Sequence, residues 1–417
     1  MTNKFYKIYY LSLLILVLAV FTSIYIFSLF KIINVWTYTE SHINYSEGFV
    51  RRGLFGTIMI ASNKYLHIPT KYFFSSFFYL FTLINVFIFF SLIKQYSKNF
   101  IIFTFLALNP ALILFSFYDL GGYARFEIAS ITTVLLHTYF VQRLNQGFLT
   151  EKKYIEKLQF IILPLIIIII FISDTMLFLI PYHIILSLNV LSKKKKLNNK
   201  IYLYLLLLIP VYLIIDNPIT LDMGKTMFDK LNNKHELDFW IIESISNNNI
   251  ISRVQVESGH MLTLKNTIIY LLIFLMFLLP IVTFFNYLNL KKNINIRNNF
   301  FIVLGIAPIF LLFPVARDWG RWIHLIIMTT FCYYSQFLLK KDLNSIIRNN
   351  LKISLTTFII IVFLFFYSFF IRIPHCCNLE KLNLTIYGGA IEKIKVLYDV
   401  FFVKKIDIDQ RFKSFKL

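Results

Sequence analysis

The sequence predicts an all-α, polytopic integral membrane protein, on the strength of its composition, its apolar runs and the placement of its charges. Hydrophobic residues make up 58% of the 417 residues and charged residues only 15%, which soluble globular chains of this length do not show. Apolar runs of about 20 residues recur along the chain and leave no room for a soluble domain of ordinary size. We therefore predict one transmembrane domain at residues 1–371 and an amphipathic, periplasmic tail at 372–417.

About eleven membrane-spanning helices are predicted from the length and apolarity of these runs. The run at 9–30 is too long for the core of a signal peptide and lacks a small-residue cleavage site, so we expect it to be retained as the first span. The other predicted spans are residues 72–93, 100–118, 126–142, 158–173, 175–191, 201–215, 267–290, 300–315, 322–339 and 353–371.

The lysines predict the orientation of these spans. The formal net charge is +21, but the lysines lie in short clusters in every alternate connection, as the positive-inside rule expects of cytoplasmic loops. We therefore place the N-terminus in the cytoplasm and predict no nucleic-acid partner. The opposite face holds arginines near carboxylates, in the connections 31–71, 119–125, 216–266 and 316–321. The positive-inside rule gives no reason for those arginines.

The first of three charged motifs is NYSEGFVRRGLFG at Asn44–Gly56. Glu47 and Arg51 are four residues apart and would share a helix face, while Arg52 would point elsewhere. Two guanidinium groups beside glycines suit a diphosphate, although a surface helix that binds lipid headgroups is the alternative. The apolar stretch Leu54–Ala61 is too short to span the bilayer, so we expect an interfacial or re-entrant helix there.

The second motif is DLGGYARFE, Asp119–Glu127, between two predicted spans. Asp119 would end one helix, and Arg125 and Glu127 would begin the next, facing different ways because they are two residues apart. Helix capping explains both carboxylates in purely structural terms. Helix capping does not explain the presence of Arg125, and this favours a functional role for the motif.

The third motif is RDWGRWIH, Arg317–His324. Asp318 and Arg321 are three residues apart, Arg317 and Arg321 are four apart, and Trp319 and Trp322 are three apart. The start of a helix would therefore make one charged and one aromatic face. Tryptophans at the end of a span belong to the interfacial aromatic belt. The three charges within five residues exceed what anchoring needs. We interpret His324 as a packing residue.

Two further outer features have structural explanations. Asp174 separates two apolar runs, and an aspartate at the centre of a membrane helix costs about 2.5 to 3.5 kcal/mol, a cost that largely disappears in a tight outer turn. We predict such a turn. The long polar connection at 216–266 is expected to cap an outer cavity and to select substrate.

Motifs for several other chemistries are missing from the sequence. It has no Walker loop, no nucleotide-binding glycine motif and no HExxH, so it gives no support to ATP-driven transport, and we predict no cofactor. Its three cysteines have neither metal-ligand nor disulfide spacing. A DxD match at Asp407 and Asp409 is weak in a chain of this composition, so no metal is predicted.

In its many spans, its outer loop and the motifs EGFVRRG, DLGGYARFE and RDWGRW, the chain resembles Wzy-type polymerases of O-antigen and capsule repeat units, and more loosely GT-C glycosyltransferases. The resemblance implies a GT-C-like helical architecture in the bacterial inner membrane, with the active face periplasmic. It implies transfer of a growing glycan from undecaprenyl diphosphate to a hydroxyl of a lipid-linked repeat unit, in lipopolysaccharide or capsule biosynthesis. A chain-length regulator protein is a possible partner.

The activity implied by this resemblance needs positive charge for the leaving diphosphate and a base for the acceptor hydroxyl. The candidate bases are Glu47, Asp119 and Asp318, with Glu47 matching the acidic residue that GT-C enzymes carry in their first outer loop. Two alternatives stay open: a flippase for the same lipid-linked glycans, and a GT-C transferase that adds one sugar. The candidate substrate-binding residues are Arg51, Arg52, Arg125, Glu127, Arg317, Arg321 and Trp322.

Overall fold

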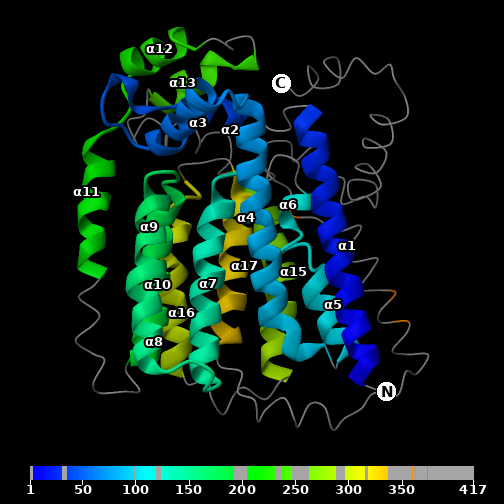
Figure 1. Cartoon of the computed structure of the whole chain (residues 1–417). Helices are drawn as coiled ribbons and strands as arrows, with labels where there is room; N and C mark the ends of the chain where they lie inside the picture. The colour runs from blue at the N-terminus through cyan, green and yellow to red at the C-terminus, as the bar shows by residue number, and fades with distance from the viewer. Residues whose placement is uncertain are drawn as a thin grey trace.

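The protein is built from helices packed side by side, and every regular element of the described residues is helical (Figure 1). The computed structural model describes residues 3–30, 35–97, 99–118, 124–191, 204–231, 236–246, 263–287, 296–314 and 318–336, together with 359, 362 and 373. The last predicted span, 353–371, and the predicted tail, 372–417, therefore lie almost wholly outside the described residues.

The helices of the bundle coincide closely with the predicted apolar runs, because each run must satisfy its own backbone hydrogen bonds where no water reaches it. One continuous rod consists of α8 (Glu151–Lys157), a π-helical turn (Leu158–Ile162) and α9 (Leu163–Ile170). The other helices of the bundle are α1 (Asn3–Phe30), α4 (Thr70–Ile93), α5 (Phe100–Leu108), α7 (Glu127–Asn145), α10 (Thr175–Leu191), α11 (Leu208–Asp216), α15 (Leu264–Tyr287), α16 (Ile296–Phe310) and α17 (Trp319–Ser335).

The predicted span at 100–118 is not one helix. Helix α5 ends at Leu108, a turn follows, and the short α6 (Phe115–Tyr118) begins after it. Pro110 explains the break, since proline lacks an amide hydrogen and disfavours a helical conformation in the residue before it. The Asn109 side chain stabilises the turn by accepting a hydrogen bond from the Ala111 amide at 2.8 Å.

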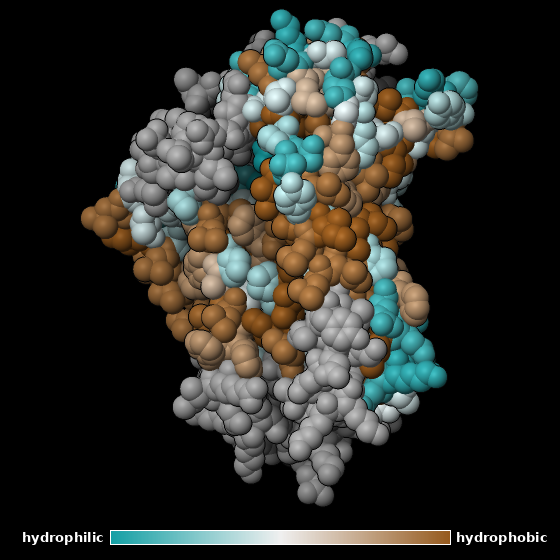
Figure 2. All heavy atoms as spheres, turned by 90° about the vertical axis from the view of Figure 1, so that its left-hand side faces the viewer, coloured by the Kyte–Doolittle hydropathy of each residue, from teal (hydrophilic) through white to brown (hydrophobic). Residues whose placement is uncertain are grey.

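Three of the described helices are long and apolar enough to cross a membrane, namely Phe5–Phe30, Thr70–Tyr96 and Leu264–Val282. A fourth span results if Tyr204–Asp216 and Leu221–Asp229, which are bent by 85° relative to each other, count as one. Hydrophobic side chains form a broad belt over the middle of the bundle, with hydrophilic groups towards its ends (Figure 2). These features are those of an all-α membrane protein.

A layer of short helices covers one end of the bundle (Figure 1). This outer layer combines α2 (Val35–Glu40), the 3-10 turn Tyr45–Glu47 and α3 (Gly53–Leu66) with α12 (Leu221–Asp229) and α13 (Phe239–Ser246). The two long connections predicted on one face thus pack against each other, and α3 is the short helix expected from Leu54–Ala61. The layer has its own small core, made by Ile43, Val50, Ile219, Met227, Ile241 and Ile245.

Gly56 explains how α3 packs so closely within the outer layer. A Cβ atom at this position would overlap the backbone carbonyl oxygens of Ile43 and Ser41. A Cβ at Gly53 would instead meet the ring of Tyr45, which is a side chain and can move. Close approach of one backbone to another requires glycine, so Gly56 sets the distance between α3 and the segment before it.

Candidate functional site

Arg52 lies at the N-terminus of α3 and connects three separate elements. Its Nε donates a hydrogen bond to Asp174 Oδ2 at 2.7 Å, and its Nη2 lies 2.6 Å from the same oxygen. Its Nη1 pairs with Glu40 Oε1 on α2. Burial lowers the pKa of Arg52, but the charges of Asp174 and Glu40 outweigh that effect and raise the pKa above its usual value. The guanidinium is therefore held in its charged form.

The backbone around the arginines is strained. Arg52 has φ of 64° and Ala124, just before Arg125, has φ of 58°, values that residues other than glycine adopt rarely. Such conformations persist only where the surrounding structure enforces them, and they concentrate at functional sites. At Arg52, the ion pairs with Glu40 and Asp174 hold the residue in this conformation.

Asp174 lies in the predicted tight turn, between α9 and α10. The turn is therefore confirmed, but it does not place the carboxylate in open water, since the side chain is only 17% exposed. The same Oδ2 oxygen that accepts from Arg52 is 3.8 Å from Arg51 Nη1. A single aspartate thus faces both arginines of the first motif.

A second set of ion pairs joins the other two motifs. Glu127 is the first residue of α7, and its Oε1 lies 2.6 Å from Arg321 Nη1 near the start of α17. Arg321 Nη2 also pairs with Asp318 Oδ2, as the three-residue spacing predicts. The Arg321 guanidinium lies over the Trp322 indole at 4.9 Å. Among the described residues, the buried Trp322 Nε1 has no hydrogen-bond partner.

The two sets of ion pairs form one site. Thr175, the residue after Asp174, donates a hydrogen bond to Glu127 Oε1 at 3.4 Å, so the two sets are adjacent, and the charges of Arg125 and Arg52 act on Glu127. All three motifs thus meet at the end of the bundle beneath the outer layer. We define the outer charge cluster by its four arginines and four carboxylates: Glu40, Arg51, Arg52, Arg125, Glu127, Asp174, Asp318 and Arg321.

Glu47 does not share a helix face with Arg51, contrary to the prediction from their spacing. The 3-10 turn ends at Glu47, and Gly48 follows with φ of 112°, which no regular helix can accommodate. The Glu47 carboxylate instead pairs with Lys230, the residue that follows α12, and this hydrogen bond lowers its pKa. A less basic carboxylate is a weaker general base.

Arg51 has a longer contact with carboxylate than Arg52 or Arg321 has. Its backbone N–H donates to Asn217 O at 3.1 Å, and its Nη2 donates to Ile245 O at 3.3 Å. Burial lowers its pKa, partly offset by the charge of Asp174. Its buried Nε has no hydrogen-bond partner among the described residues. Arg51 therefore lies where the cluster meets the outer layer, and it has donor capacity to spare.

Two candidates from the sequence, Asp119 and Arg317, lie outside the described residues. Three residues with a clear place in the structure were not predicted as site residues: Glu40 and Asp174 in the cluster, and Lys230 as the partner of Glu47. Glu40 and Lys230 have no opposite charge at helical spacing, and Asp174 was explained by its turn alone, so spacing along the chain offered no signal for these contacts. Among the described residues, no group of three or more His, Cys, Asp or Glu could hold a metal.

Comparison with protein-family models, curated proteins and solved structures finds no significant match to this chain. The resemblance to polysaccharide polymerases therefore remains a prediction. The chemistry of the cluster is more general. Guanidinium groups that already make charge-assisted hydrogen bonds to carboxylates can make the same bonds, in bidentate geometry, to phosphate oxygens.

Proposed function

We propose that the protein is a membrane glycosyltransferase that polymerises undecaprenyl-diphosphate-linked oligosaccharide repeat units of O antigen or capsule. The observation that supports this most is the convergence of three arginine-bearing motifs in one cluster at one end of an apolar bundle. Charged groups beside a membrane are costly and are usually associated with function. A lipid-linked diphosphate presents its charge at that depth while its hydrocarbon remains in the bilayer.

The proposal includes the topology on which it depends. The chain would cross the bacterial inner membrane about eleven times in a GT-C-like arrangement, with the N-terminus in the cytoplasm and the cluster at the periplasmic face. The outer layer would then cover the site from the periplasm. A chain-length regulator would approach from that side.

The arginines would act on the leaving group. A diphosphate would first meet Arg51, which has donor capacity to spare, and would then compete with the carboxylates for Arg321 and Arg52. Release of Asp318 from Arg321 would leave a carboxylate beside the bound diphosphate. We favour Asp318 over Glu47 as the base for the acceptor hydroxyl, because Asp318 lies in the cluster whereas Glu47 is paired with Lys230.

The test is complementation of a deletion strain, with gel analysis of its surface polysaccharide. Wild type should restore long chains, whereas Arg51→Ala, Arg321→Lys and Asp318→Asn should leave single-repeat material at unchanged protein level; lysine keeps the charge that Glu127 and Asp318 need but not the bidentate geometry. Arg143→Ala is the matched control, since Arg143 lies at the opposite end of α7 and stacks on Phe148. Full chain length in all three cluster variants would refute the site assignment.

The same gels distinguish the remaining functions. Intact chains that lack one sugar would indicate a GT-C transferase that adds a single residue. Accumulation of the lipid-linked unit in the inner leaflet would indicate a flippase. The flippase is the second candidate because transporters place polar groups inside the helical bundle, and this bundle fully buries His137 and His183.

A further inference from the structure

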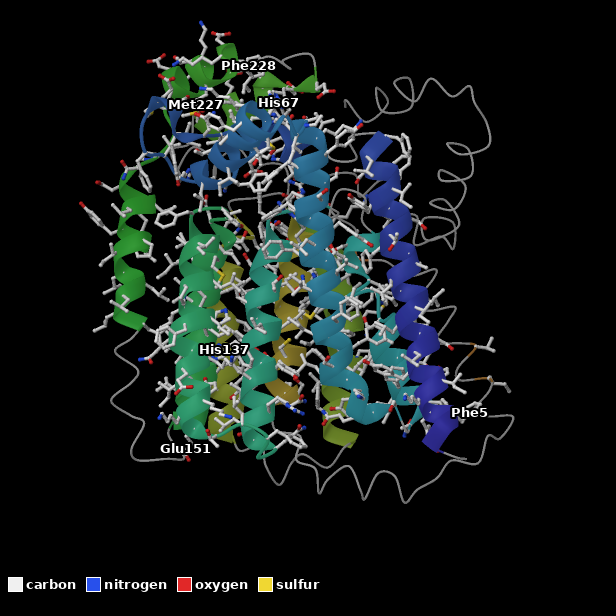
Figure 3. All side chains as sticks on the ribbon, viewed as in Figure 1. Phe5, His67, His137, Glu151, Met227 and Phe228 are labelled. Carbon is white, nitrogen blue, oxygen red and sulfur yellow. The ribbon has the colours of Figure 1, made fainter. Side chains whose placement is uncertain are left out.

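A chain of buried polar side chains runs between α7, α8 and α10, separate from the outer charge cluster. Figure 3 places His137 inside the bundle, between Glu151 at one end and Met227 in the outer layer at the other. Ionisable side chains within membrane bundles are rare and often belong to proton relays. The members of the chain are Thr133, His137, Tyr154, His183, Ser187 and Tyr204, all at most 6% exposed.

Hydrogen bonds connect these side chains without a gap. Tyr154 Oη is 2.9 Å from His137 Nε2, His137 Nδ1 is 2.9 Å from His183 Nδ1, and His183 Nε2 is 3.1 Å from Thr133 Oγ1. A side branch begins at Tyr154 Oη, 3.3 Å from Ser187 Oγ, which lies 2.8 Å from Tyr204 Oη. The Tyr204 hydroxyl donates to the backbone carbonyl of His183 at 3.0 Å.

The direction of the bonds follows from where the Thr133 hydroxyl points. When it donates to Ser130 O, at 2.7 Å, His183 Nε2 must donate to Thr133, and His183 Nδ1 must accept from His137 Nδ1. His137 Nε2 then accepts from Tyr154. In this first state both imidazoles are neutral, and Ser187 donates to Tyr204. Every donor in the chain has an acceptor.

A second state satisfies the same atoms in the opposite direction. The Thr133 hydroxyl turns to donate to His183 Nε2, His183 Nδ1 donates to His137 Nδ1, and His137 Nε2 donates to Tyr154 Oη. Tyr154 then donates to Ser187 Oγ, while Ser187 and Tyr204 keep their bonds. Both imidazoles are again neutral, with exchanged tautomers, and no heavy atom has moved.

Passage of one proton converts the first state into the second. A proton that arrives on Tyr154 Oη displaces the hydroxyl hydrogen to His137 Nε2. The Nδ1 proton of His137 moves to His183, the Nε2 proton of His183 moves to Thr133, and the original Thr133 hydrogen leaves. One proton enters and one leaves, so charge and atoms balance, and a further proton passes in the same direction only after the tautomers and hydroxyl groups return to the first state. A network that only stabilised the fold would need one arrangement in which every donor has an acceptor. Here the Ser187 hydroxyl also provides the acceptor that Tyr154 needs in the second state, when Tyr154 no longer donates to His137.

We propose that this chain is a proton relay that links the α8 end of the bundle with the outer charge cluster. The exit at Thr133 is followed along α7, at three-residue spacing, by the hydroxyl of Ser130 and the carboxylate of Glu127. Among the described residues, the fully buried Ser130 Oγ has no hydrogen-bond partner, as expected of a group that passes a proton on through an ordered water. The proposal does not depend on which reaction the cluster performs.

The surroundings of the histidines are compatible with a neutral relay. Among the described residues, the titratable groups that face the pair are Tyr154 from α8, Tyr204 before α11 and Tyr182 of α10, whose ring is 5.9 Å from that of His183. Cys332 of α17 lies beyond Tyr182. Tyrosines and thiols carry no charge at neutral pH unless they are strongly perturbed, so no fixed charge traps the proton.

Histidine nitrogen NMR on the full-length protein in lipid nanodiscs tests the two states directly. We expect His137 and His183 each to exchange between both neutral tautomers, so that one ring is protonated at Nδ1 whenever the other is protonated at Nε2. The variants His137→Gln and His183→Gln would assign the signals. Thr133→Val should leave the chain without its exit and abolish the exchange. A single fixed tautomer for either ring, from mildly acidic to neutral pH, would overturn the proposal.

Proton flux into liposomes with an enclosed pH-sensitive dye provides the functional measurement. Wild type should admit protons faster than protein-free liposomes under an imposed potential, and His137→Gln should reduce the rate to that background. Glutamine keeps a donor and an acceptor but cannot exchange protons between two nitrogens. Thr138→Val, which removes a 3.3 Å hydrogen bond to Tyr182 outside the relay, should leave the rate unchanged. Equal rates with and without protein, or with and without His137, would exclude the relay.

Discussion

Replacement of Arg52 by glutamine should destabilise the protein strongly. The change removes the charge that faces Glu40 and Asp174 but keeps a polar side chain of similar reach. The carboxylates are only 9% and 17% exposed, so neither can recover the hydration it loses on folding. Glu127 would also lose the attraction of the Arg52 charge.

The structure sets the magnitude of this effect. Removal of one partner of a buried ion pair typically costs about 3 to 5 kcal/mol, because an uncompensated charge remains. Arg52 faces two carboxylates and its side chain is 23% exposed, so solvent screening offsets part of the effect of the second carboxylate. We therefore expect a loss within about 3 to 5 kcal/mol. Combining Arg52→Gln with Asp174→Asn should recover part of it, since the double variant has one orphaned charge fewer.

The assay is equilibrium unfolding of the purified protein in mixed micelles of denaturing and non-denaturing detergent, followed by tryptophan fluorescence. Lys230→Gln is the matched control, because it also removes a cation from an ion pair, but one whose lysine is 58% exposed. We expect no measurable change for that variant. If Arg52→Gln and Lys230→Gln unfold at the same detergent fraction as wild type, the network at Arg52 contributes no net stability and our reasoning is wrong.

Two further predictions concern the outer layer. Burial lowers the pKa of His42 to about 4 from its ordinary 6.5. Between these pH values the unfolded chain binds more protons than the folded protein, so the free energy of unfolding should fall by up to about 3 kcal/mol as the pH drops from 6.5 to 4. Hydrogen exchange at α12 and α13 should report this loss, and His42→Gln should abolish the pH dependence; an unchanged profile would contradict a buried neutral imidazole. Gly56→Ala should cost about 1 to 3 kcal/mol or more by overpacking, and clearly more than Gly53→Ala, because a backbone carbonyl cannot move aside as the Tyr45 ring can; equal stability of the two variants would exclude a close backbone contact at Gly56.

The sequence by itself determined that the protein is helical and apolar, and it located most of the helices. A run of apolar residues must form a helix in a bilayer because no water can satisfy its backbone, and this argument is local. The turn at Asp174 and the pair Asp318–Arg321 were predictable for the same reason, since a tight turn and a three-residue helical spacing involve only neighbouring residues.

Only the tertiary structure decided which charges meet. Arg52 is 12 positions from Glu40 and 122 positions from Asp174. No periodicity links the three residues, because their contact depends on how α2 and α3 lie on the bundle. Glu47 shows the converse: its spacing predicted Arg51 as partner, but Gly48 ended the turn and Lys230, the residue that follows α12, is the partner instead. Helix positions follow from solvent and backbone chemistry along the chain, whereas the site follows from the packing of whole helices.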